Sequence, residues 1–133
     1  NLKTNKSKIK KIVATFKKKG IRTSLFINPS LTDIKISKDL KTDCVEIHTG
    51  RLSNLIKLKR NFKNELQKIK SCSKYAQSLG LEVHAGHGLD YKTTKFLKKI
   101  DTIKEFNIGH FIVGESIFFG LNKVIKNFKK IIK

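Results

Sequence analysis

The feature that most constrains the fold is the repeated alternation of short apolar runs with longer helical segments. Runs that end in Gly, Asn or Pro, typical of buried strands, fall at residues 22–28, 44–50, 81–86 and 106–114. Helical periodicity precedes the first run and follows each one, at residues 7–19, 34–40, 52–79, 93–100 and 115–133. This order predicts an α/β fold in which parallel strands are joined by crossover helices.

Polar and apolar residues alternate within these strands, although strands of a parallel sheet are usually buried on both faces. In the second strand, Val45 and Ile47 share one face while Glu46 and His48 share the other. Residues 81–84 repeat the pattern. We therefore expect one apolar face packed on helices and one polar face, leading to a site at the carboxyl ends of the strands, as in a barrel of parallel strands.

The histidines fall in or just after the C-terminal halves of predicted strands and outside the predicted helices, so we expect them on one rim. They are His48, His84, His87 and His110. In HAGHGLD, Gly86 and Gly88 flank His87, and we expect them to let the backbone turn sharply so that the imidazole projects over the rim. Because histidine titrates near neutral pH, His87 is a candidate proton donor or acceptor for a small substrate.

The last predicted strand ends in NIGH, which offers Gly109 without a side chain and His110 beside it. The helix start in VGESIF is a candidate phosphate site, because free N–H groups at a helix start bind anions. Glu46 either pairs with a lysine or steadies positive charge on a reacting atom, since a carboxylate in a barrel mouth is otherwise costly. A zinc site is a further alternative. Its ligands would be Glu46, His48, His84 and His87.

The net charge of +20 raises the alternative of a nucleic-acid-binding module. We favour a solvated lysine surface, because base and phosphate recognition favour arginine and the lysines are spread over every helical segment. Cys44 and Cys72 lack metal-ligand spacing and are predicted to be reduced core residues. The N-terminus lacks an apolar signal core, and no run of 18 apolar residues occurs, so we expect a cytoplasmic protein with no membrane partner.

Four motifs occur in order at the four predicted strand ends: SLFINP, VEIHTG, LGLEVHAGHGLD and FNIGHFIVGESIFFGL. Together they resemble the pyridoxine 5'-phosphate synthase family over nearly the whole chain from about Ser24. The resemblance implies a (β/α)8 TIM barrel with extra helices, an octamer, and catalysis without metal or organic cofactor. It also implies condensation of 1-deoxy-D-xylulose 5-phosphate with 3-amino-2-oxopropyl phosphate to pyridoxine 5'-phosphate, inorganic phosphate and water.

The same resemblance assigns roles to the motif residues. His87 of AGHG becomes the proton donor, and Glu46 of EIHTG stabilises the transition state. Gly88 would lie against the amino-ketone substrate, whose phosphate end Gly109 and His110 of NIGH would bind.

Two positions depart from the family pattern. His84 stands where asparagine is expected, which predicts altered hydrogen bonding near His87. Glu115 follows Gly114 where many relatives carry arginine, and its carboxylate would repel a phosphate if it turned inward.

Family members are nearly twice as long, so we expect residues 1–133 to be the C-terminal half of a single barrel domain, with about four βα units. The N-terminal half, which holds a catalytic base histidine and most of the pentulose phosphate site, has no counterpart, and the lack of methionine agrees with an incomplete sequence. We expect the isolated piece to associate or aggregate and to lack synthase activity. The alternatives are another barrel enzyme acting on a phosphorylated metabolite, or a half-barrel that docks on a partner.

Overall fold

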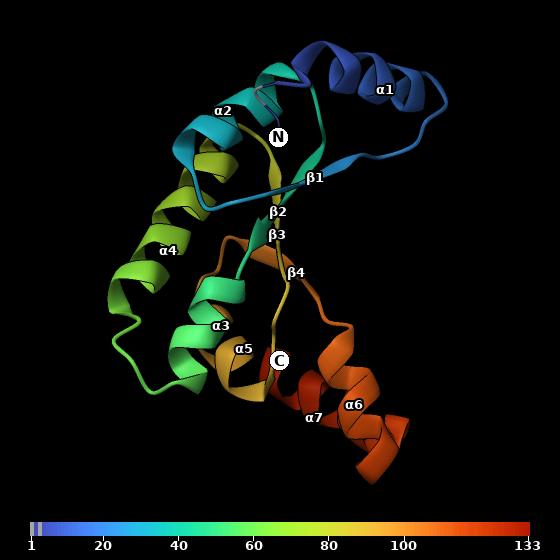
Figure 1. The fold of residues 1–133 in the computed structure, drawn as a ribbon. Helices are drawn as coiled ribbons and strands as arrows, with labels where there is room; N and C mark the ends of the chain where they lie inside the picture. Colours follow the sequence, from blue (N-terminus) through green and yellow to red (C-terminus); the bar gives the residue numbers. More distant parts are fainter. Residues whose placement is uncertain (1, 3) are drawn as a thin grey trace.

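A computed structural model describes residue 2 and residues 4–133 of the chain. The described residues form one parallel sheet in the order β1-β2-β3-β4, with helices between successive strands (Figure 1). The strands are β1 (Ser24–Ile27), β2 (Cys44–His48), β3 (Glu82–Gly86) and β4 (Ile103–Asn107). The helices are α1 (Lys6–Lys18), α2 (Leu31–Asp39), α3 (Gly50–Lys57), α4 (Lys63–Ser78), α5 (Tyr91–Leu97), α6 (His110–Phe119) and α7 (Leu121–Ile132). The predicted α/β class with parallel strands is confirmed.

One face of the sheet is apolar and packs on helices, as the alternation predicted. Val45 and Ile47 of β2 are fully buried, and Val83 of β3 continues the same row. Helices α2 and α4 lie on this side and contact the strands (Figure 1). Burying one such aliphatic side chain stabilises the fold by about 1.5 to 3 kcal/mol, so this core holds the strand ends in place.

The opposite face carries the polar residues in two rows set by the strand register. One row contains Phe26, Glu46, His84 and Glu105, and the next contains His48, Gly86 and Asn107. Phe26 keeps 53% of its surface exposed, and Glu105 is also exposed. The described residues therefore leave this face partly open.

The helix predicted over residues 52–79 is instead two helices, because α3 ends at Lys57 and α4 begins at Lys63. The chain turns at Lys59, whose φ of 54° lies in the left-handed region. Asn61 precedes α4, and its side-chain oxygen accepts a hydrogen bond from the N–H of Lys63, the first residue of the helix, at 3.1 Å. The apolar repeat continues across the turn and so concealed it.

The fourth strand lies earlier than predicted, at Ile103–Asn107 rather than 106–114. Residues 110–119 form α6, so the prediction that the histidines avoid helices is wrong for His110, the first residue of that helix. A short apolar run such as FIVG cannot be assigned to strand or helix by periodicity alone, which explains the error.

Two other sequence predictions concern the core and the membrane. Cys44 and Cys72 are both buried and free, which confirms their assignment to the interior. Within the described part of the chain, no helix is long and apolar enough to cross a bilayer.

Candidate functional site

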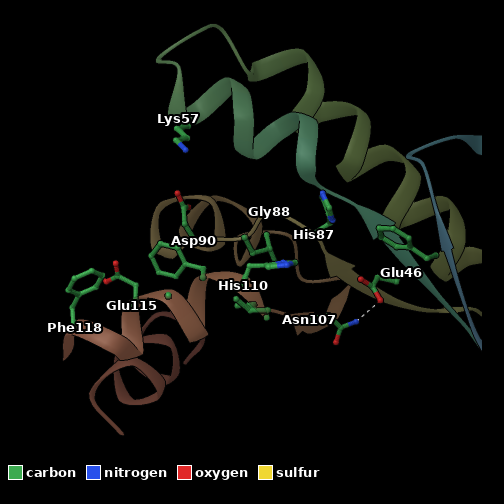
Figure 2. A pocket seen from close by; sticks show the side chains of 15 residues that line it. Glu46, Lys57, His87, Gly88, Asp90, Asn107, His110, Glu115 and Phe118 are labelled. Carbon is green, nitrogen blue, oxygen red and sulfur yellow. Dashed lines mark hydrogen bonds between the residues drawn. The ribbon is translucent and has the colours of Figure 1, made fainter. Parts of the chain in front are cut away.

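A cavity of about 880 Å³ opens at the carboxyl end of the sheet, between the strand ends and α6. Its lining includes all five residues predicted to act on the substrate: Glu46, His87, Gly88, Gly109 and His110. Figure 2 shows Glu46 and His87 on the sheet side, with Glu115 and Phe118 of α6 across the opening. The structure thus brings these five positions together, while their chemical roles stay predictions.

The loop after β3 takes a strained path at the predicted proton donor. His87 has a φ of 74°, a conformation that side chains rarely adopt, and Gly88 follows with the same φ. A Cβ at Gly88 would also lie 3.3 Å from Gly50 Cα and Ser53 Cβ, so glycine is needed there for two reasons. The turn therefore occurs at His87 and Gly88, whereas Gly86 keeps an ordinary backbone, contrary to the prediction.

Thr49 fixes this strained loop. Its hydroxyl lies 2.8 Å from the carbonyl oxygens of both Gly86 and His87, and its backbone N–H donates to Gly86 at 2.9 Å. Thr49 is fully buried, so water does not compete for these contacts. Left-handed backbone at a residue other than glycine costs about 1 to 3 kcal/mol, and such hydrogen bonds offset it. Sequence reasoning missed Thr49, although it stands in the EIHTG motif.

His48 stacks on His87, with ring centroids 4.5 Å apart and an interplanar angle of 25°. Gly50 makes room for the pair, because a Cβ there would lie 2.7 Å from an atom of each ring. The Gly50 N–H donates to Nδ1 of His48 at 3.3 Å, so that nitrogen is an acceptor. Burial, and next the neighbouring His87 charge, hold the pKa of His48 below its usual value, while Glu46 raises it.

This pKa shift predicts a pH dependence of stability. Because the pKa of His48 is lower in the folded chain than its ordinary 6.5, the unfolded chain binds more protons near pH 6. The contribution of His48 to the free energy of unfolding is therefore present above the ordinary pKa of histidine. It is lost as the pH falls through the lower pKa that His48 has in the folded chain. We expect His48→Asn, which keeps an acceptor near Nδ1 but does not titrate, to lose less melting temperature between pH 7.5 and about 5. The melting temperatures can be measured by circular dichroism. An equal loss of melting temperature in the parent and the variant would show that His48 is not the group responsible.

His84 does not join the other histidines, so the prediction of four on one rim is wrong at this position. Its Nε2 lies 2.8 Å from a carboxylate oxygen of Glu82, and its Nδ1 lies 3.6 Å from Glu105. It sits in the middle of β3, one row below the rim, and is buried. The hydrogen bond from His84, and then that from Arg22, hold the pKa of Glu82 below its usual range.

The zinc hypothesis joined residues that the structure separates, because the ring nitrogens of His84 lie near Glu82 and Glu105. Among the described residues, the side chains near enough to share a metal ion are instead Cys44, Glu82 and His84. The Arg22 guanidinium lies 2.9 Å from the Cys44 sulfur and 3.0 Å from a Glu82 oxygen. A cation already occupies that place and would repel a second one.

The start of α6 is suited to an anion. Gly109 is the N-cap residue and has no side chain to cap the helix, so the N–H groups of the first turn are available to a ligand. His110, Lys57 and Glu115 also line the cavity (Figure 2). Glu115 therefore lies on the cavity side, where its carboxylate opposes a phosphate, while Lys57, which sequence reasoning missed, adds a positive charge.

Glu46 has an amide partner instead of the lysine that sequence reasoning considered. Nδ2 of Asn107 donates to Oε2 of Glu46 at 2.8 Å, across the intervening strand β3 (Figure 2). Both residues line the cavity. Asn107 was missed as a site residue, although it opens the NIGH motif.

Comparisons with known proteins identify related sequences. Residues 1–133 match the family model described as pyridoxal phosphate biosynthesis protein PdxJ. The chain is 63% identical over 131 residues to a pyridoxine 5'-phosphate synthase from Pelagibacter ubique, covering 98% of the chain and 55% of the relative. Synthases of the same name from a Sulfurihydrogenibium species and Zymomonas mobilis are 41% and 43% identical, over 93% and 91% of the chain and 50% and 46% of the relatives. The chain thus spans about half the length of these curated relatives.

Proposed function

We propose that this chain, which belongs to the PdxJ family of pyridoxal phosphate biosynthesis proteins, is the C-terminal half of a pyridoxine 5'-phosphate synthase. The whole protein would condense 1-deoxy-D-xylulose 5-phosphate with 3-amino-2-oxopropyl phosphate, closing the pyridine ring and releasing phosphate and water. The observation that carries the proposal is that the five motif residues, which lie far apart in the sequence, line one cavity.

The fold proposal is that residues 1–133 form half of a single (β/α)8 barrel domain. The strands run in sequential order and are all parallel, as in one half of such a barrel. In the described chain β1 and β4 are edge strands, and the half-exposed Phe26 lies on the face that would become the barrel interior. The part of the relatives that this chain does not span would supply the other half.

Each site residue has a proposed task in the chemistry. The phosphate of the amino ketone would bind the N–H groups at the start of α6, with Gly109 leaving room and His110 donating a hydrogen bond. Gly88 would let the same substrate approach the loop after β3. His87 would give up a proton during ring closure, and Glu46 would stabilise positive charge that develops in the transition state.

Association with further protein is part of the proposal. Helix α6 exposes Val113, Ile117 and Phe118 at 65%, 77% and 80% of their surfaces, which is unusual for large apolar side chains outside an interface. On the family resemblance, we propose a cytoplasmic octamer that acts on small phosphorylated substrates and needs no metal, organic cofactor or nucleic acid.

The test uses a completed enzyme, in which this chain follows the N-terminal part of the Pelagibacter ubique relative. We expect it to form pyridoxine 5'-phosphate and release inorganic phosphate when given both substrates, with and without a metal chelator. The isolated chain is expected to form none, because it lacks the proposed base and most of the pentulose phosphate site. Product can be followed by chromatography and phosphate by a colorimetric assay.

Two outcomes would overturn parts of this proposal. Product formation by the purified chain alone would contradict its assignment as an inactive half. A correctly folded completed enzyme that makes no product would contradict the synthase itself, and activity that is lost with the chelator would favour the alternative of a zinc-dependent barrel enzyme.

A further inference from the structure

The hydrogen bond between Asn107 and Glu46 joins strands that are not neighbours. Glu46 is in β2 and Asn107 ends β4, with β3 between them. Glu46 pairs with His84 of β3 and Asn107 pairs with Gly86, so the bond crosses β3 diagonally between these two positions. The 2.8 Å contact therefore requires the Glu46 side chain to lie flat over β3 instead of extending directly outward.

Gly86 is what permits this arrangement. A Cβ built there would lie 1.8 Å from Oε1 of Glu46, 2.7 Å from its carboxyl carbon and 3.3 Å from Cβ of Asn107. Its backbone is outside the left-handed region, so the missing side chain, and not a turn, is the property that matters. The first glycine of HAGHG thus provides the space in which the carboxylate is held.

The partner of the carboxylate is a neutral amide. Among the described residues, the ion pairs do not include Glu46, and Asn107 provides its side-chain hydrogen bond. An amide donor orients a carboxylate without neutralising its charge, whereas a lysine or arginine would do both. In the part of the chain that the structure describes, Oε1, which lies against Gly86, accepts no side-chain hydrogen bond, so a neutral amide orients the carboxylate and no cation of the protein is paired with it.

We propose that Asn107 is a positioning residue for Glu46, with Gly86 as the space that its orientation requires. The inference rests on the proposed synthase function, since it concerns how the transition-state stabiliser of that reaction is held. A preorganised charge costs no reorganisation when the reaction occurs, so a carboxylate that is free to rotate stabilises the transition state less. The proposed role therefore concerns kcat more than substrate affinity.

Two substitutions in the completed enzyme test this role, one at the hydrogen-bond donor and one at the space that the carboxylate fills. Asn107→Ala removes the donor, and Gly86→Ala places a methyl group where the carboxylate lies. We expect each to lower kcat by about 10- to 100-fold, with KM for both substrates changed by less than about threefold. Because both act through the same carboxylate, the double variant should lose much less than the product of the two single losses.

A third substitution gives a readout that a purely structural role would not produce. Asn107→Asp keeps the shape but places a second carboxyl beside Glu46, and two adjacent carboxyls tend to share one proton at low pH. The protonated form can donate the hydrogen bond again. We expect the ratio of variant to parent kcat to rise by about tenfold from pH 8 to pH 5.5. Asn61→Asp is the matched control, because its exposed side chain only accepts a hydrogen bond, and its ratio should stay flat.

The outcomes separate this inference from the function on which it rests. Product formation by the unmodified completed enzyme supports the function whatever the variants do. If it forms product while Asn107→Ala and Gly86→Ala keep kcat within about threefold, or while Asn107→Asp shows a flat ratio, the positioning role is overturned and the function stands. If the unmodified enzyme forms no product, the function is overturned, and the positioning role with it.

Discussion

Replacing His87 by asparagine in the completed enzyme should lower kcat for pyridoxine 5'-phosphate formation by about 10²- to 10⁴-fold, the range that general acid catalysis contributes. Asparagine cannot donate a proton as an acid near neutral pH. It is also the side chain best suited to this position after glycine, because asparagine tolerates the left-handed backbone that His87 adopts at a φ of 74°. The loss should therefore be chemical, with the fold and the Thr49 contacts to the backbone retained.

The matched control is Lys59→Asn, which makes the same replacement at another left-handed position outside the cavity. It should keep the parent turnover. Both variants should keep melting temperatures near that of the parent enzyme. Unchanged turnover in the His87 variant would remove this histidine from the mechanism, and a large loss of melting temperature would assign it to folding instead.

Glu46→Gln should lower kcat by about 10²- to 10³-fold, as expected when one preorganised electrostatic contact to the transition state is lost. Glutamine has nearly the same shape as glutamate, and its side-chain oxygen can still accept from Asn107. The substitution therefore removes mainly the charge. KM should change little if the positive charge that Glu46 stabilises develops after substrate binding, so both parameters have to be measured.

Glu105→Gln provides the control, because Glu105 lies in the same row of the sheet as Glu46 but contacts His84 at 3.6 Å and lies outside the cavity lining. The same loss of charge there should leave kcat within about twofold of the parent, as is usual for an exposed carboxylate. Equal effects of the two substitutions would indicate a general field effect of the sheet and would contradict a specific role for Glu46.

The sequence was sufficient to predict the apolar and polar faces of the sheet and the edge at which the strand ends lie. Alternation in β2 separates Val45 and Ile47 from Glu46 and His48, and parallel strands bring their carboxyl ends to one edge, so the rim followed from chain order. The motifs then identified His87 as the residue in the tight turn. These inferences depend on local periodicity and topology, which a single sequence carries.

Contacts between distant residues could not be predicted in the same way. His84 lies on the predicted face of the sheet, but one row of residues farther from the carboxyl ends of the strands than expected. Its partner is Glu82, two residues before it. The bond from Asn107 to Glu46 spans 61 positions and depends on a missing side chain at Gly86. A single sequence does not show which pairs meet across a sheet, and it cannot distinguish a glycine needed for space from one needed for a turn.

A crystal structure of the completed enzyme with 3-amino-2-oxopropyl phosphate bound would show whether the cavity residues hold this substrate. We expect the phosphate group on the backbone N–H groups at Gly109 and His110, and the reacting end of the molecule within hydrogen-bond distance of His87 and beside the Glu46 carboxylate. A ligand held elsewhere, with its phosphate away from α6 and its reacting atoms out of reach of His87, would contradict the proposed substrate site.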